Sequence, residues 1–219
     1  MRIAVLGTGT VGETIGSRLV ELGHEVRMGS RSASNEKAVA WAGQAGERAS
    51  HWTFADAAAF ADELVFNCTK GEASLEALRQ AGAENLRGKV LLDVSNPLDF
   101  SQGFPPTLSV CNTDSLGEQI QREFPDLRVV KTLNTMWCGL MVNPGQLAGG
   151  DHTVFMSGND EAAKGKVREL LQQLGWREGS ILDLGDLSTC RGTEMMLPIW
   201  LRVMGATRTS AFNFRVVRQ

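Results

Sequence analysis

The feature that most constrains this chain is a glycine-rich turn near its start, Gly7-Thr8-Gly9-Thr10-Val11-Gly12. An apolar run over residues 2–6 comes directly before the turn. Residues 10–22 follow it and carry apolar side chains at helical spacing, with Gly23 placed to end the helix. The pattern predicts a buried parallel strand, a tight turn and an amphipathic helix.

Each glycine of this turn has its own physical use. Gly7 allows the tight turn out of the strand, Gly9 lets a pyrophosphate approach the backbone, and Gly12 lets the helix pack closely on the sheet. The free amides and the dipole at the helix N-terminus then attract phosphate. In this strand–turn–helix context the motif predicts a dinucleotide-binding site made by Gly7, Thr8, Gly9, Thr10, Val11 and Gly12.

The end of the second predicted strand, residues 25–28, indicates which dinucleotide binds. It continues as Gly29-Ser30-Arg31 and contains no carboxylate to accept hydrogen bonds from the ribose hydroxyls of NAD. Ser30 can donate to a 2′-phosphate, Arg31 can pair with it as a planar fork, and Lys37 adds positive charge. The sequence therefore predicts NADP(H) in preference to NAD(H).

Apolar runs alternate with amphipathic stretches along the remaining chain, a pattern typical of an α/β fold with a doubly wound parallel sheet. Strands are predicted at residues 63–68, 89–94, 128–131, 153–156 and 181–184. Helices are predicted at residues 36–45, 73–81, 114–124 and 160–174, with a helical region at 188–204 that Pro198 must start or kink. Residues 97–112 are predicted to form a long loop, and loops of that length are often functional.

Ligands of such sheets bind beyond the carboxyl ends of the strands. Three polar segments follow predicted strands at that edge, Asn67-Cys68-Thr69-Lys70, Ser95-Asn96-Pro97-Leu98 and Thr132-Leu133-Asn134-Thr135. We expect them to surround the nicotinamide and its ribose. The further cofactor-binding residues predicted on this ground are Cys68, Thr69, Asn96, Pro97, Asn134 and Thr135.

Composition and spacing exclude several other classes. The net charge is −3 and no basic tract is present, which argues against nucleic acid as a partner. No apolar stretch approaches the roughly 20 residues of a membrane span, and the apolar run at the N-terminus is shorter than that of a secretory signal, so we expect a cytoplasmic protein without a membrane partner.

Two further residue types narrow the chemistry. The four cysteines and three histidines are isolated from one another, so no metal site is predicted. The chain contains no tyrosine, which excludes the short-chain dehydrogenases, because they use a tyrosine for proton transfer.

With these segments in place, the chain resembles the NADPH-dependent reductases of the deazaflavin coenzyme F-420. The resemblance extends from the N-terminal glycine motif through Gly29-Ser30-Arg31, Asp93-Val94-Ser95-Asn96-Pro97-Leu98 and Val129-Val130-Lys131-Thr132-Leu133-Asn134-Thr135. It continues with Ser157-Gly158-Asn159-Asp160 and Arg191-Gly192-Thr193-Glu194.

The resemblance implies a Rossmann domain over residues 1–136 and a small C-terminal α/β region over residues 137–219, which caps the acceptor cleft and pairs two subunits as a homodimer. It also implies an oxidoreductase that transfers a hydride between NADPH and a flavin-like acceptor. That acceptor is expected to be coenzyme F-420, with FMN or FAD as other co-substrates.

Hydride transfer between two ring systems requires close stacking more than acid–base help. We therefore name no catalytic residue, and we interpret Asp93 and Glu194 as capping or surface carboxylates. Two other readings remain open. One is an NADPH-dependent reductase of another flavin or of a small carbonyl or imine substrate. The other is a non-catalytic NADP(H) sensor that signals through a partner.

Overall fold

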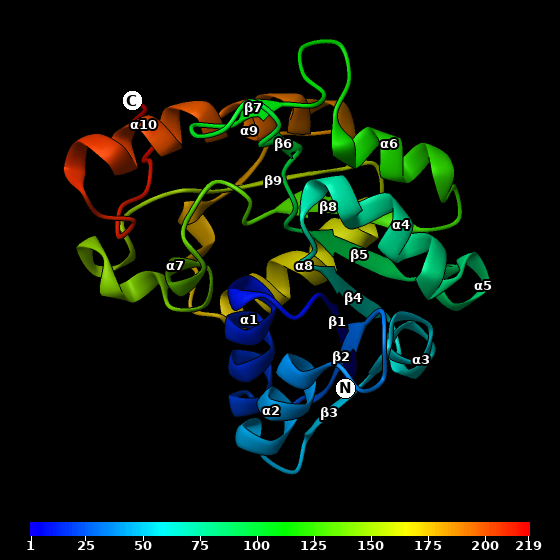
Figure 1. Ribbon diagram of the computed structural model, residues 1–219. Coiled ribbons are helices and arrows are strands. Elements are labelled where there is room, and N and C mark those ends of the chain that lie inside the picture. The colour runs from blue at the N-terminus through cyan, green and yellow to red at the C-terminus, as the bar shows by residue number, and fades with distance from the viewer.

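Eight strands form one sheet in the computed structural model, which describes residues 1–219 (Figure 1). The strand order is β10-β9-β8-β5-β4-β1-β2-β3. The chain winds from β1 through β2 to β3 and then continues on the other side of β1 with β4, β5 and β8, so its direction reverses between β1 and β4. The strand bounds are β1 Arg2–Leu6, β2 Glu25–Ser30, β3 Ala49–Thr53, β4 Leu64–Asn67, β5 Val90–Asp93, β8 Arg128–Thr132, β9 Val154–Gly158 and β10 Ile181–Asp183.

Helices cover both faces of the sheet. One face packs against α1 (Thr10–Glu21), α2 (Glu36–Ala45), α7 (Cys138–Val142) and α8 (Glu161–Gln173). The other packs against α3 (Phe54–Phe60), α4 (Gly71–Ala81), α5 (Ala83–Leu86) and α6 (Leu116–Glu123). Two helices follow β10, α9 (Cys190–Met195) and α10 (Leu197–Thr207). Short 3-10 turns lie at Pro144–Gln146, Ala148–Gly150, Glu178–Ser180 and Leu187–Thr189.

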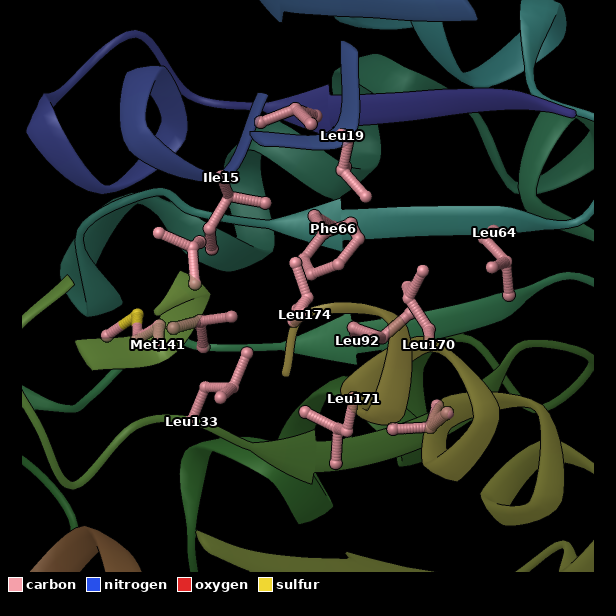
Figure 2. Packing of buried hydrophobic residues seen from close by; sticks show 14 of the residues in the cluster. Ile15, Leu19, Leu64, Phe66, Leu92, Leu133, Met141, Leu170, Leu171 and Leu174 are labelled. Atoms are coloured by element: carbon pink, nitrogen blue, oxygen red, sulfur yellow. The ribbon is translucent and has the colours of Figure 1, made fainter. Parts of the chain in front are cut away.

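The buried strands are apolar on both sides because each side meets a helical layer. In β1, Ile3 and Val5 belong to one apolar cluster, whereas Ala4 and Leu6 belong to the other. Figure 2 shows the larger cluster, where side chains of α1 and α8 meet strand residues such as Phe66. These observations confirm the predicted α/β class and the doubly wound arrangement.

The last two strands run against the other six, a direction that the sequence did not predict. β9 pairs antiparallel with β8, and β10 pairs parallel with β9. Both strands extend the same sheet, so the second of the two predicted regions shares hydrogen bonds with the first. The division at residues 136 and 137 stays a prediction.

The strand β3 and the helices α3, α5 and α7 were not predicted, and two predicted segments, residues 97–112 and 188–204, are further divided in the structure. β3 and α3 were missed because the edge strand β3 has no fully buried residue and α3 is a short alanine-rich helix. The predicted loop of residues 97–112 contains a small hairpin, β6 (Leu98–Asp99) with β7 (Thr107–Leu108), whose two-residue strands are too short to show periodicity. The predicted helical region at 188–204 is divided into a 3-10 turn, α9 and α10, with Pro198 near the start of α10.

None of the helices combines the length and the apolar character needed to cross a lipid bilayer.

Candidate functional site

The turn between β1 and α1 contains two glycines whose neighbours leave no room for a side chain and one glycine with open space around it. Gly7 has a φ of +119°, and a Cβ atom added there lies 2.7 Å from the carbonyl oxygen of Cys68. A Cβ atom on Gly12 lies 2.2 Å from the carbonyl oxygen of Gly7. At Gly9 an added Cβ atom meets no protein atom within 4 Å. Folding therefore requires glycine at the first and third positions of the motif but not at the second.

The N-terminus of α1 presents free backbone donors beside this turn. Gly9 occupies the N-cap position and supplies no side-chain cap. The amide of Glu13 donates to the carbonyl oxygen of Gly9 over 3.0 Å, so the amides of Thr10, Val11 and Gly12 precede the first intrahelical bond. Uncapped amides of this kind, together with the helix dipole, form an anion-binding position.

A cavity of about 550 Å³ opens at the carboxyl edge of the sheet, where the strand order reverses. Eight of the predicted residues line it together. They come from the turn after β1, from the end of β2, from α2 and from the turn after β4: Gly7, Thr8, Gly9, Ser30, Arg31, Lys37, Cys68 and Thr69.

The positive side of this cavity is formed by Arg31 and Lys37. Both side chains are exposed, and neither has a carboxylate within ion-pair distance. Ser30 is buried, and its hydroxyl donates to the carbonyl oxygen of Ser32 over 2.6 Å. Ser30 thus stabilises the turn that carries Arg31, and its direct contact with a phosphate stays a prediction.

The opposite wall is formed by the turn after β4 and by α4. The hydroxyl of Thr69 donates to Oδ1 of Asn67 over 2.6 Å, which fixes this turn. Burial raises the pKa of the Cys68 thiol far above its ordinary value, with smaller contributions from Asp93 and Cys138, so Cys68 is a neutral lining residue.

Sequence reasoning missed most of the remaining lining residues. They are Asn35, Phe54, Glu72, Ala73, Glu76, Ala77 and Gln80, whereas Lys70, which also lines the cavity, belongs to a segment that was expected there. Phe54 was missed with its helix. The α4 residues share one face at helical spacing, and this spacing was the available signal.

A second group of predicted residues lies together outside the cavity lining. Nδ2 of Asn96 donates to the carbonyl oxygen of Asn134, and Nδ2 of Asn134 donates to Oδ1 of Asn96, each over 2.9 Å. This reciprocal pair joins the segment after β5 to the segment after β8, where Pro97 and Thr135 also lie. A Cβ atom on Gly71 lies 2.0 Å from the carbonyl oxygen of Asn96, so this segment abuts the N-terminus of α4.

Asp93 and Glu194 are deeply buried, which corrects the interpretation of a surface role. Nζ of Lys131 lies 2.7 Å from Oδ2 of Asp93 and 2.8 Å from Oε1 of Glu194. Glu194 does cap a helix, because the amides of Leu116 and Gly117 at the start of α6 donate to it. The lysine inside the buried strand β8 was the available signal, since a buried ammonium needs carboxylate partners.

No group of three histidine, cysteine, aspartate or glutamate side chains is arranged to hold a metal ion.

Comparison with known proteins fits this geometry. The family model for NADP oxidoreductase, coenzyme F-420-dependent, matches residues 2–97. A crystal structure of a protein from Arthrobacter sp. FB24, provisionally named an F-420-dependent NADP reductase, has 55% sequence identity and a TM-score of 0.95, and 100% of each chain is covered.

More distant proteins share parts of this arrangement. Metalloreductase STEAP3 of Rattus norvegicus is 30% identical over 207 residues, which cover 91% of this chain but only 38% of that protein. A Streptomyces aurantiacus imine reductase has 19% identity and a TM-score of 0.67 over 95% of this chain and 63% of its own, a likeness of fold alone. The match over full length at 55% identity and the family-model match decide the assignment: the chain belongs to the family of coenzyme F-420-dependent NADP oxidoreductases.

Proposed function

We propose that this oxidoreductase binds NADP(H) in the cavity, with the pyrophosphate over Gly9 and the 2′-phosphate between Arg31 and Lys37. The observation that carries the proposal is that Gly9 lines the cavity at the uncapped N-terminus of α1, although the packing around it does not require a glycine. No protein atom lies within 4 Å of a Cβ atom added there, so the protein itself gives no reason for a glycine. A pyrophosphate that must approach the main chain closely gives a reason for glycine at this position.

The residues present fit such a cofactor. The uncapped amides at the start of α1 are placed to donate to the pyrophosphate. Arg31 and Lys37 line the same cavity without carboxylate partners, so their charges are free to meet a phosphate. The proposed cofactor-binding set keeps the predicted residues, with Asn96, Pro97, Asn134 and Thr135 on the nicotinamide side.

When bound, NADPH supplies a hydride from its nicotinamide ring. The chain contributes by holding the rings in line and by excluding water, which lowers the barrier mainly through orientation. The Asn96–Asn134 pair fixes the backbone of two segments at this edge. We assign no general acid or base, and the proposed catalytic contribution is positional.

We propose coenzyme F-420 as the hydride acceptor. The family match and the name of the Arthrobacter protein support this choice over FMN, FAD or a small imine. A flat deazaflavin also suits a reaction that depends on stacking rather than on side-chain chemistry.

The test is a parallel turnover assay. Purified protein is mixed with NADPH and coenzyme F-420, FMN or FAD, and the loss of NADPH absorbance is followed, with NADH as the matched control. Rapid oxidation with NADPH and coenzyme F-420 is expected. Faster turnover with FMN or FAD contradicts the acceptor. Tight NADPH binding without turnover by any acceptor favours the sensor reading.

We also propose a cytoplasmic homodimer paired through α10. Ile199 of α10 is 51% exposed, and Met195 at the end of α9 is 37% exposed. Apolar surface is therefore available for a second copy of the chain. Sedimentation equilibrium is expected to show a dimer, and Ile199→Glu should shift it toward monomer. A wild-type monomer at micromolar concentration contradicts this assembly.

A further inference from the structure

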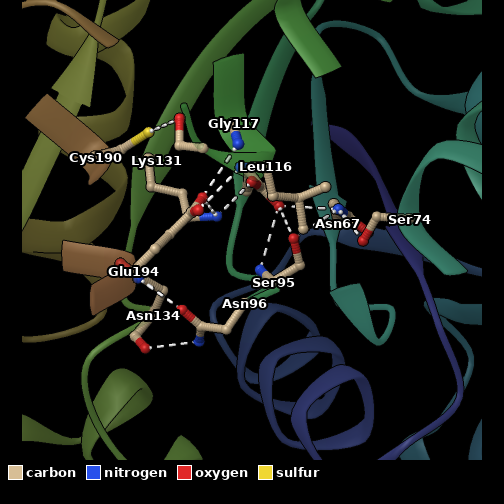
Figure 3. A network of polar contacts seen from close by, with 12 residues as sticks. Asn67, Ser74, Ser95, Asn96, Leu116, Gly117, Lys131, Asn134, Cys190 and Glu194 are labelled. Carbon is tan, nitrogen blue, oxygen red and sulfur yellow. Dashed lines mark hydrogen bonds and ion pairs between the residues drawn. The ribbon is translucent and has the colours of Figure 1, made fainter. Parts of the chain in front are cut away.

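A buried chain of polar contacts joins the C-terminal helix α9 to the segments beside the cofactor cavity (Figure 3). Its centre is Lys131, whose ammonium lies between Asp93 of β5 and Glu194 of α9. The side chains of Lys131 and Asp93 are 0% exposed, and that of Glu194 is 2% exposed.

The second carboxylate oxygen of Asp93 carries the chain toward the site. Oδ1 of Asp93 accepts from the hydroxyl of Ser95 over 2.7 Å, from the amide of Ser95 over 3.2 Å and from Nδ2 of Asn67 over 2.8 Å. Ser95 directly precedes Asn96. Asn67 in turn accepts from Thr69, which lines the cavity. The contacts of Asp93 therefore end on two of the three segments that are expected to surround the nicotinamide, those after β4 and after β5.

The charges of the cluster do not balance among its own members. Two carboxylates face one ammonium, and the amides of Leu116 and Gly117 at the positive end of the α6 dipole complete the neutralisation. Burial alone lowers the pKa of Lys131, but the charges of Asp93 and Glu194 outweigh it and raise the pKa, so the ammonium stays protonated.

Stability alone does not account for such a cluster. Replacing a buried ion triad by apolar residues is often neutral or stabilising, because the charges lose their hydration. What ionic contacts add is a defined geometry, since each partner fixes the next through directed hydrogen bonds.

We propose that Glu194 is a positioning residue that acts through Lys131 and Asp93 to hold the Ser95–Asn96 segment beside the cofactor. The C-terminal helices thereby control the nicotinamide side of the site, although α9 does not line the cavity. This inference rests on the proposed function for its catalytic consequence, but its structural consequence can be measured without turnover.

The experiment compares Glu194→Gln with Arg191→Gln as a matched control. Arg191 also links α9 to α6, through Glu118 at 2.5 and 2.8 Å, but it does not touch Lys131. Glu194→Gln keeps the shape, removes one charge and replaces one of the two oxygens that accept from the amides of Leu116 and Gly117. We expect faster amide hydrogen exchange in a peptide covering residues 94–98, on the order of tenfold, and a similar fall in kcat with little change in the Kd of NADP⁺. Arg191→Gln should leave exchange and kcat within about twofold of wild type.

Unchanged exchange in Glu194→Gln, or an equal effect in Arg191→Gln, overturns the proposal, because the effect is then absent or is a general loosening of α9. Ser95→Ala provides an independent arm at the far end of the chain of contacts, and it decides the case if Glu194→Gln does not fold. It should lower kcat at a temperature well below its Tm, and a wild-type kcat contradicts the proposal. If none of the tested acceptors supports NADPH oxidation by the wild-type protein, the proposed function fails. The hydrogen-exchange comparison still decides whether Glu194 positions the segment.

Discussion

Replacing Gly9 by alanine separates cofactor binding from folding. The backbone of Gly9 has φ −86° and ψ 176°, an extended conformation that alanine adopts without strain. The new methyl group meets no protein atom within 4 Å. The same substitution at Gly12 would place a methyl carbon 2.2 Å from the carbonyl oxygen of Gly7, which the turn cannot accommodate.

The expected change in stability is small because two effects oppose each other. Alanine is a poorer N-cap than glycine, but it also lowers the conformational entropy of the unfolded chain, so the free energy of unfolding should change by less than about 1 kcal/mol. The effect on binding is larger. A methyl group forced between the main chain and a pyrophosphate costs about 1–3 kcal/mol, which corresponds to an increase of roughly fivefold to 150-fold in the Kd of NADPH.

Calorimetric titration with NADPH and urea unfolding measure the two quantities on the same sample. Gly165→Ala is the matched control, because Gly165 lies in α8 and its added Cβ atom also meets nothing within 4 Å. The control should gain about 0.5–1 kcal/mol of stability as a helix-interior substitution and bind NADPH normally. If Gly9→Ala binds NADPH as tightly as wild type, the placement of the pyrophosphate is wrong.

Three further substitutions test other parts of the structure. Arg31→Gln should weaken NADPH binding by about tenfold or more and leave NADH binding unchanged, because only NADPH carries the 2′-phosphate; equal losses for both in a titration would contradict this. Lys131→Met should destabilise the fold by about 3–5 kcal/mol in urea unfolding, since it leaves two buried carboxylates unpaired, and a neutral effect would contradict the ionic cluster. The hydrogen bond from Arg122 lowers the pKa of Asp114 to about 2 from its ordinary 3.8, so this pair adds stability above the ordinary pKa and loses it as the pH falls toward 2. Asp114→Asn should therefore lower the free energy of unfolding at pH 7 and hardly change it at pH 2, and equal losses at both values would refute the linkage.

Much of the fold could be predicted because its buried strands are continuous apolar runs. The strands β1, β4 and β5 lie between two helical layers, and their nearly continuous apolar residues indicate burial on both sides. The edge strand β3 could not be found in this way, because one side of its pairing is open and its residues are only partly buried. The direction of β9 was also missed, since no local pattern distinguishes a parallel strand from an antiparallel one in a fully buried setting.

The candidate site could be predicted in part, for a related reason. Backbone-dependent positions such as Gly7 leave a clear signal, because few residues tolerate a φ of +119°. Residues of α4 such as Ala73 and Gln80 leave only their helical spacing as a signal, since they reach the cavity through the packing of α4 in the folded chain. The burial of Glu194 depends on its pairing with Lys131, 63 positions earlier in the numbering, and such a pairing exists only in the folded chain.

The central claim is direct hydride transfer from NADPH to a ring acceptor, and isotopic transfer tests it most directly. NADPH is prepared with deuterium on one face or on the other of the reactive ring carbon, and each form is oxidised by the protein with coenzyme F-420. One of the two forms is expected to deliver its deuterium to the reduced acceptor, as measured by mass spectrometry, because the site holds the ring in one orientation. An acceptor that is reduced without deuterium from either form would show that the hydrogen comes from solvent, and direct hydride transfer would then be ruled out.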